Sequence, residues 1–201
     1  MQATVAERIL AYAQSQPEGT ILCAKDLLHL GARPAVDQTL KRLAGKSELL
    51  KLYRGAYVRP VETKFGTRAP EPAKVVESIK RAQAETVVPH GAAEANALGL
   101  TTQVPSRIVY LTSGKSRTLT LGAQVVEMKH APRWMLMSSP GEAGRLVRAL
   151  EWLGERRAPA ALMSLKQTLP LSQVQELVAV RSALPSWLAK SIGDVLVARH
   201  G

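Results

Sequence analysis

Cysteine and long apolar runs are scarce in this chain of 201 residues. The single cysteine, Cys23, has no partner for an internal disulfide, so nothing in the sequence indicates an oxidising compartment, and we expect a structural thiol. No run of about 18 apolar residues occurs, so the sequence predicts no membrane-spanning helix. Residues 1–16 contain Glu7 and lack an apolar core, so we expect no secretory signal and a cytoplasmic protein.

Aromatic residues and catalytic motifs are scarce as well. Aromatic residues make up 4% of the chain and Phe65 is its only phenylalanine, so the core must be built from Leu, Val, Ile and Ala. The four histidines match no metal-ligand spacing, and neither a GxSxG nor an HExxH motif occurs. The segment TSGKS, residues 112–116, lacks the first glycine of a phosphate-binding loop. The sequence therefore predicts no metal, no cofactor and no catalytic residues.

Positive charge is what the chain has in excess. Lys and Arg number 27 against 16 Asp and Glu, which gives a net charge of +11 and a pI near 10.2. Such a surplus favours a polyanionic partner, nucleic acid before an anionic membrane. The surplus is spread over the whole chain, so charge alone does not locate a binding surface.

The first 60 residues have the pattern of three helices followed by a hairpin. Apolar spacing predicts helices over 4–15, 24–30 and 34–45, and runs rich in Leu, Tyr and Val predict strands over 49–53 and 56–60. Thr4, with Glu7 three residues later, predicts a capping box, and Arg54-Gly55 predicts a tight turn. This is the plan of a winged helix-turn-helix, whose second paired helix enters the DNA major groove.

The rest of the chain predicts a second domain. Three prolines in residues 60–72 indicate a linker or a docking strap. Helices are expected over 72–84 and 92–100 and from Gly141 onward, with breaks at Gly154, Pro170 and Pro185, and strands over 85–91, 107–113 and, as a pair turning near Gly122, 117–131. We predict an α+β fold, with a winged helix-turn-helix DNA-binding domain over 1–62 and a mixed domain over 70–201 that has a small β-sheet and a helical C-terminal part.

Seven side chains form the predicted DNA interface: Arg33, Gln38, Lys41, Arg42, Lys51, Arg54 and Arg59. On the helix, Arg33 and Gln38 can read base edges, while Lys41 and Arg42 suit phosphates. The remaining three place positive charge on the hairpin. A solvated amphipathic helix also presents a charged face, and the helix taken alone favours that interpretation. The basic hairpin that follows favours DNA.

Three segments, taken together, resemble the AbiEi-type antitoxins of type IV toxin–antitoxin systems: AVDQTLKRLAGKSELLKLYRGAYVRP, VVPHGAAEANALGLTTQVP and RIVYLTSGKSRTLTLG. The resemblance covers roughly residues 30–135. It implies a winged helix that binds inverted repeats at its own promoter and represses the operon. It also implies a C-terminal domain that antagonises a cognate nucleotidyltransferase-like toxin, in systems associated with abortive infection by phage. Ala32 and Arg33 depart from the pattern, since Ser or Asn is expected there as the cap of the recognition helix.

We therefore expect a non-enzymatic antitoxin and autorepressor whose partners are double-stranded operator DNA and the toxin, with no membrane partner. One alternative is a winged-helix regulator whose second domain senses a ligand or a partner. Another is an enzyme that acts on nucleic acid with His90 and Glu94 as an acid–base pair. The competing interpretation of His90 is a hydrogen-bonded structural histidine at a helix start.

Overall fold

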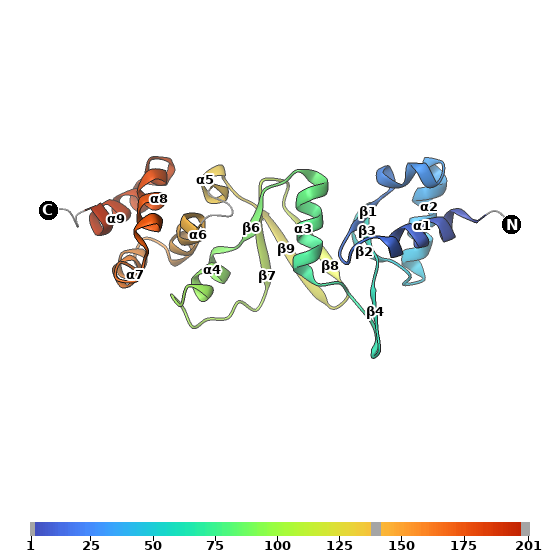
Figure 1. Cartoon of the computed structure of the whole chain (residues 1–201), viewed down its shortest axis with the longest axis horizontal. Coiled ribbons are helices and arrows are strands. Elements are labelled where there is room, and N and C mark those ends of the chain that lie inside the picture. Colours follow the sequence, from blue (N-terminus) through green and yellow to red (C-terminus); the bar gives the residue numbers. More distant parts are fainter. Residues whose placement is uncertain (1–2, 138–141, 198–201) are drawn as a thin grey trace. The chain divides into compact units, whose positions relative to one another are not determined.

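A computed structural model describes residues 3–137 and 142–197, which fold as two compact units (Figure 1). Unit 1 comprises residues 1–87 and 116–128, and unit 2 comprises residues 88–115 and 129–201. The fold is α+β, as predicted. The units do not coincide with the predicted domains, because residues 72–87 and 116–128 belong to unit 1. The boundary of an independent DNA-binding domain stays a prediction.

The N-terminal part of unit 1 follows the predicted order of helices and strands. Its elements are α1 (Val5–Ser15), β1 (Ile21–Cys23), the 3₁₀ helix η1 (Ala24–Leu30), α2 (Arg33–Gly45), β2 (Leu50–Tyr53) and β3 (Ala56–Val58). The capping box is present, since Thr4 Oγ1 accepts from the Glu7 N–H and the Glu7 carboxylate accepts from the Thr4 N–H. The apolar faces of the helices form one core with Leu49 and Tyr57.

The strands of this part form a three-stranded antiparallel sheet in the order β1-β3-β2. Leu50 pairs with Val58, and the register shifts between Lys51 and Tyr53. Gly55 has a φ of +83° in the turn between β2 and β3, where a residue without a Cβ is favoured. The β2–β3 hairpin is the wing of the predicted winged helix-turn-helix.

The segment over residues 60–72, for which the sequence indicated a linker or docking strap and no strands, contains a second hairpin. Strand β4 (Val61–Thr63) pairs antiparallel with β5 (Gly66–Arg68). Pro60 and Pro70 are buried and flank the strands, so neither removes a donor from the ladder. Gly66 has a φ of +110° and follows the two-residue tip.

Unit 1 also contains α3 (Pro72–Gln83), β8 (Arg117–Leu121) and most of β9 (Gln124–His130). Strands β8 and β9 form a hairpin in which Leu119 pairs with Val126. Helix α3 contacts β1, and Ser78 Oγ accepts from the Ile21 N–H at 2.9 Å. Strand β8 contacts β2, where the Arg117 guanidinium lies 5.9 Å from the centre of the Tyr53 ring. Unit 1 is therefore larger than a winged helix.

The other elements continue into unit 2. They are β6 (Val87–Pro89), α4 (Gly91–Ala97), β7 (Ile108–Thr112), α5 (Arg133–Leu136), α6 (Glu142–Leu153), α7 (Ala158–Leu165), α8 (Leu171–Val180), the 3₁₀ helix η2 (Arg181–Ala183) and α9 (Ser186–Leu196). The helix breaks lie at Gly154, Pro170 and Pro185, as predicted, whereas Gly141 lies outside the described residues and α5 was not predicted. Helix α6 contacts α4, α5, α7 and α8, so it is the centre of this unit. Within the described ranges, no helix has the length and apolar character needed to cross a membrane.

Candidate nucleic-acid interface

Helix α2 directs its apolar side chains into the core of unit 1 and leaves polar ones in solvent. Gln38, Lys41 and Arg42 are all exposed, while Leu40 and Leu43 are buried. At 3.6 residues per turn, the three polar positions lie on one side of the helix. The structure therefore brings three of the predicted residues together on the face opposite the core.

Arg33, the first residue of α2, lies outside this face, one helical turn before Asp37. Its Nε is 2.9 Å from Asp37 Oδ2, and both side chains are about half exposed. An exposed pair of this kind contributes little to stability, so a phosphate or a base can compete with Asp37 for the guanidinium. Ala32 occupies the N-cap without a side-chain hydrogen bond, and Pro34 lies in the first turn, as the sequence indicated.

The wing presents its polar side chains outward and its aromatic ones inward. Lys51 and Arg54 are exposed. Tyr57 is buried in the core, and the Tyr53 hydroxyl accepts from Gln83 Nε2 at 2.7 Å. Burial raises the pKa of both tyrosines. Neither ring is placed for base stacking. Of the predicted contacts on the wing, Lys51 and Arg54 are therefore the exposed ones.

Arg59 lies apart from the other predicted contacts. It is half-buried, and its Nε donates to the Ala13 carbonyl at 3.1 Å, at the end of α1. This bond joins β3 to α1, and a role of Arg59 in DNA binding stays a prediction. Lys46 was missed by the sequence reasoning, although it follows Arg42 by one helical turn and is exposed. Its spacing was the signal that could have found it.

The surroundings of Cys23 favour a structural thiol over a nucleophile. It is half-buried at the end of β1, and burial, with a smaller effect of Asp26, raises the pKa of its thiol. A raised pKa keeps the thiol protonated near neutral pH and therefore poorly nucleophilic. Among the described residues, no group of three or more His, Cys, Asp or Glu side chains is arranged to hold a metal ion.

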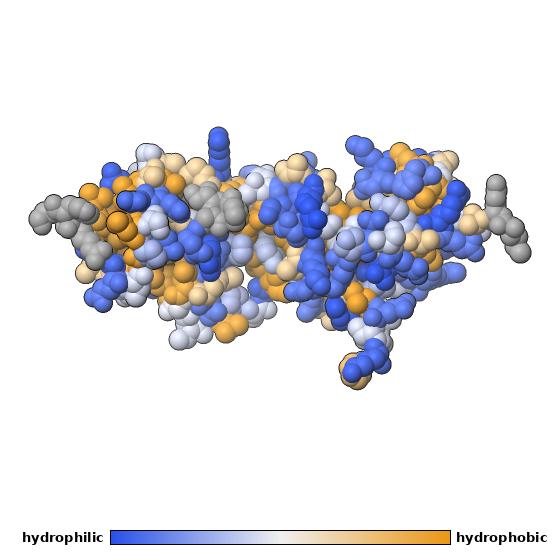
Figure 2. Space-filling model, viewed as in Figure 1, coloured by the Kyte–Doolittle hydropathy of each residue, from blue (hydrophilic) through white to orange (hydrophobic). Residues whose placement is uncertain are grey.

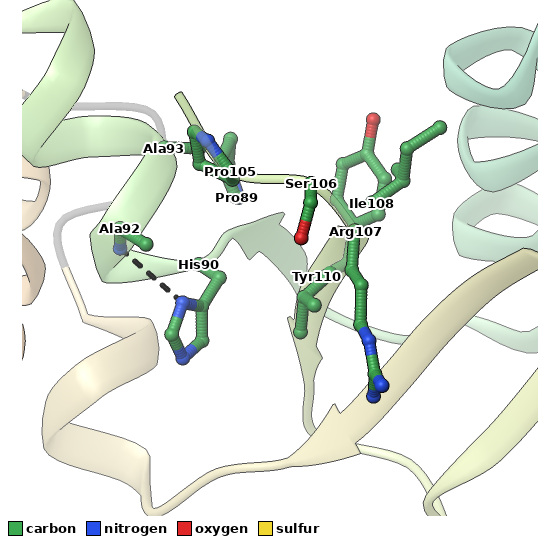
Figure 3. A pocket seen from close by; sticks show the side chains of 10 residues that line it. Pro89, His90, Ala92, Ala93, Pro105, Ser106, Arg107, Ile108 and Tyr110 are labelled. Atoms are coloured by element: carbon green, nitrogen blue, oxygen red, sulfur yellow. Dashed lines mark hydrogen bonds between the residues drawn. The ribbon is translucent and has the colours of Figure 1, made fainter. Parts of the chain in front are cut away.

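In unit 2, His90 caps a helix and Glu94 forms buried ion pairs. His90 is the N-cap of α4, and its Nδ1 accepts from the Ala92 N–H at 3.2 Å (Figure 3). Glu94 is 4% exposed, and its carboxylate accepts from Arg145 Nε at 2.9 Å and from Arg148 at 2.8 Å. The bond to Glu94 is the main cause of the raised pKa of Arg145. This ion-pair network gives the acid–base alternative no support.

Gly91, the first residue of α4, lies against helix α6. A Cβ at this position would lie 2.2 Å from the Arg148 carbonyl oxygen and 2.7 Å from Trp152 Cβ. Only glycine allows α4 to lie this close to α6. The first turn of α4 is therefore a packing contact.

A half-open cavity of about 440 Å³ lies beside His90 in unit 2 (Figure 3). Its lining comes from two segments: Pro89, His90, Ala92 and Ala93 around the start of α4, and residues 105–110 before and in β7. Most of these side chains are apolar, with the polar groups of Ser106, Arg107 and Tyr110 among them. Its volume is within the range of small-molecule sites.

Comparisons with known proteins identify a family and a fold. Residues 8–173 match a family model described as "Family of unknown function (DUF6088)". No curated protein matches the chain. The crystal structure of the RV2827C protein from Mycobacterium tuberculosis is similar, with a TM-score of 0.53 and 19% sequence identity, covering 100% of this chain and 83% of that chain. At this identity the likeness concerns the fold alone.

Proposed function

Since the chain belongs to the DUF6088 family of unknown function, we propose from its own residues that it is a DNA-binding autorepressor and antitoxin. The exposed polar face of α2, together with the exposed basic side chains of the wing, carries the DNA-binding part of this proposal. The antitoxin part rests on the resemblance of three sequence segments to AbiEi-type antitoxins of type IV systems. Both activities would be non-enzymatic, would need no cofactor and would take place in the cytoplasm.

In the proposed complex, α2 lies in the major groove of an operator. Gln38 and Arg33 have side chains that can form paired hydrogen bonds with base edges. Lys41 and Arg42 lie on the same side of α2 as Gln38 and would contact phosphates, while Arg54 would contact the backbone from the wing. An operator made of inverted repeats would take one copy of the chain at each half-site.

The test of DNA binding is a titration of the full-length protein against DNA from directly upstream of its own gene, followed by fluorescence anisotropy. Neutralising about six phosphates would give a slope near −5 in log K against log salt concentration. A scrambled duplex of equal length is the control for sequence preference. Binding that does not respond to salt, or that is equal for both duplexes, would refute the proposal.

Two substitutions distinguish recognition of the base sequence from contacts with the DNA backbone. Arg54→Ala should weaken binding to every duplex alike and reduce the salt slope by about 1, whereas Gln38→Ala should change sequence preference. Arg156→Ala is the matched control, because it removes one exposed positive charge from unit 2. If the first two variants bind like the parent, the assigned surface is wrong.

The antitoxin part is tested by co-expression with the protein encoded by the adjacent gene, with growth as the readout. The double variant Lys41→Ala, Arg42→Ala should rescue growth like the parent if antitoxin activity is separate from DNA binding. This variant is preferable to a truncation at residue 70, because unit 1 includes residues 116–128. Failure of both forms to rescue would refute the antitoxin function.

The cavity of unit 2 favours a second candidate function, a winged-helix regulator that senses a small ligand. Its lining is largely apolar with a few polar groups, which is typical of ligand sites. Under this alternative, a ligand that raises the melting temperature should also change DNA affinity, and the substitution Ala93→Trp, which fills the cavity, should abolish both effects. An adjacent toxin gene would count against it.

A further inference from the structure

The tip of the β4–β5 hairpin has an ordered backbone geometry. Thr63 Oγ1 donates to the Gly66 carbonyl at 2.7 Å and accepts from the Phe65 N–H at 3.2 Å. At its other end, Arg68 contacts the Glu18 carboxylate at 3.2 Å and the Ala69 carbonyl at 2.8 Å. A two-stranded hairpin is marginal on its own, so these bonds are what hold this one in a defined shape.

The tip exposes the only phenylalanine of the chain. Phe65 is 89% exposed, the largest fraction among the exposed large apolar side chains of the described residues. The Lys64 ammonium lies 4.9 Å from the centre of its ring, so an aromatic and a cation are paired at the end of the hairpin. The hairpin projects from the body of unit 1 (Figures 1 and 2). Burial of a Phe side chain is favourable, and in the isolated unit this ring stays in solvent.

The position of this hairpin follows from the sheet topology. Strands β2 and β3 are antiparallel, and Leu50, which enters β2, pairs with Val58, which leaves β3. The β4–β5 hairpin therefore leaves the sheet at the end where α2 arrives, opposite to the tip of the wing. A cavity of about 280 Å³ is lined both by residues that follow α2 (Ser47, Glu48) and by hairpin residues (Glu62, Thr67). The two hairpins thus lie at opposite ends of the sheet, and the β4–β5 hairpin lies at the end that follows the C-terminus of the proposed recognition helix.

The chemistry of the tip favours DNA over other partners. One Phe side chain buries about 150–250 Å², far below the 1,200–2,000 Å² of a specific protein interface. Stable membrane binding needs a larger apolar face or a lipid anchor. A single apolar wedge is enough, however, to enter a groove and partly unstack one base step, which kinks the duplex. The neighbouring Lys64 can contact a phosphate at the same place.

We propose that the tip of the β4–β5 hairpin is a second DNA contact, in which Phe65 wedges at a base step beside a groove and Lys64 contacts a phosphate. This inference rests on the proposed DNA-binding function and extends it from one wing to two. It implies that the bound duplex is bent, and that part of the affinity is apolar and independent of salt.

The test uses full-length protein and duplex DNA from upstream of its own gene, labelled at both ends so that energy transfer reports bending. Phe65→Ala should raise Kd about tenfold, reduce the change in energy transfer, and leave the salt slope unchanged, since no counterion is involved. Lys64→Ala should reduce the slope by about 1. Val125→Ala, which trims a half-exposed apolar side chain of unit 1, is the control and should change neither quantity.

The outcomes separate this inference from the function on which it rests. If the parent binds with a steep salt dependence but Phe65→Ala binds and bends DNA like the parent, the contact at the β4–β5 tip is refuted. The proposed contact through α2 and the wing is not affected by this result. If the parent itself does not bind, the proposed function fails. Sedimentation with phosphatidylglycerol vesicles provides the remaining comparison. Vesicle binding that depends on Phe65, with DNA binding unaffected, would assign the tip to a membrane surface and overturn the inference.

Discussion

At the scale of single residues, the Glu18 carboxylate joins three segments of unit 1. It contacts Lys74 Nζ at 2.6 Å and Arg68 at 3.2 Å, and it accepts from the Glu71 N–H at 3.0 Å. The bond with Lys74, followed by that with the Glu71 N–H, lowers the pKa of Glu18 to about 2. The turn before β1 is thereby held to the base of the β4–β5 hairpin and to the start of α3.

Glu18→Gln should destabilise the chain in a pH-dependent way. A carboxyl whose pKa is lower in the folded state stabilises it above the unfolded pKa of 4.5, and this contribution is lost as pH falls toward 2. Because the side chain is 21% exposed and partly screened by solvent, we expect about 1 kcal/mol at pH 7. Urea denaturation at pH 7 and pH 3 measures it, and the difference between parent and variant should shrink at pH 3.

Glu71→Gln is the control for this prediction. Its carboxylate lies 3.8 Å from Lys74 and is 58% exposed, so its loss should change the free energy of unfolding by less than about 0.5 kcal/mol. Equal effects of the two substitutions, or a Glu18 effect that does not depend on pH, would contradict the assignment of Glu18 as the joining residue.

Residue-level features could be predicted from the sequence where their partners are local. Thr4 and Glu7 are three residues apart, and their capping box is present as expected. Glu18 contacts residues 50–56 positions away, and no spacing rule connects such positions. For the same reason, the sequence did not predict the hydrogen bond from Arg59 to the Ala13 carbonyl. Arg59 had been assigned to the DNA interface because of its charge, and this bond gives it a structural contact as well.

At the scale of elements, α4 and α6 are joined by a buried charge network. The Arg148 side chain is 3% exposed, its terminal nitrogen donates to Glu94, and its Nε is buried without a partner among the described atoms. Breaking a buried pair by removing one member leaves an uncompensated charge, which costs more than the pair itself stabilises. The network therefore fixes how the two helices lie against each other.

Glu94→Gln keeps the side-chain volume but removes the negative charge, so we expect a loss of about 3 kcal/mol in the free energy of unfolding. Glu142 is the other acidic partner of Arg145, and its side chain is 43% exposed. Glu142→Gln should therefore lower the free energy of unfolding by less than about 1 kcal/mol. Chemical denaturation of both variants measures the difference. Recovery of stability in a Glu94→Gln, Arg148→Met double variant would assign the loss to the stranded charge, whereas a mild effect of Glu94→Gln alone would contradict the argument.

Most elements were predictable because apolar periodicity is a local signal. The three N-terminal helices, the wing and the C-terminal helices lie within a few residues of their expected bounds. The β4–β5 hairpin was missed because its short strands carry mostly exposed polar residues and lack the apolar run that marked the wing, and because the flanking prolines suggested a linker or docking strap. The buried positions of Pro60 and Pro70 at the strand ends become apparent only in the folded chain.

At the scale of the whole molecule, the feature hardest to predict from the sequence was that unit 1 is built from two separate chain segments. The chain leaves unit 1 after Val87 and returns for residues 116–128. Strand β8 contacts β2, some 60 residues earlier, and a strand carries no local signal of which distant strand it will contact. A division into consecutive domains, 1–62 and 70–201, was therefore the natural prediction from the sequence.

Because unit 1 includes α3 and β8, we predict that a fragment of residues 1–62 is less stable than the same residues in the full chain. The fragment lacks Ser78, which accepts from the Ile21 N–H, and Arg117, which lies over Tyr53. It also lacks the α3 backbone, which lies so close to Gly19 that a Cβ there would be 2.8 Å from Lys74. Hydrogen exchange should show faster exchange of the Ile21 amide and of β2 in the fragment. Equal protection in both forms would instead make the winged helix an independent domain, with α3 and β8 as attachments to it.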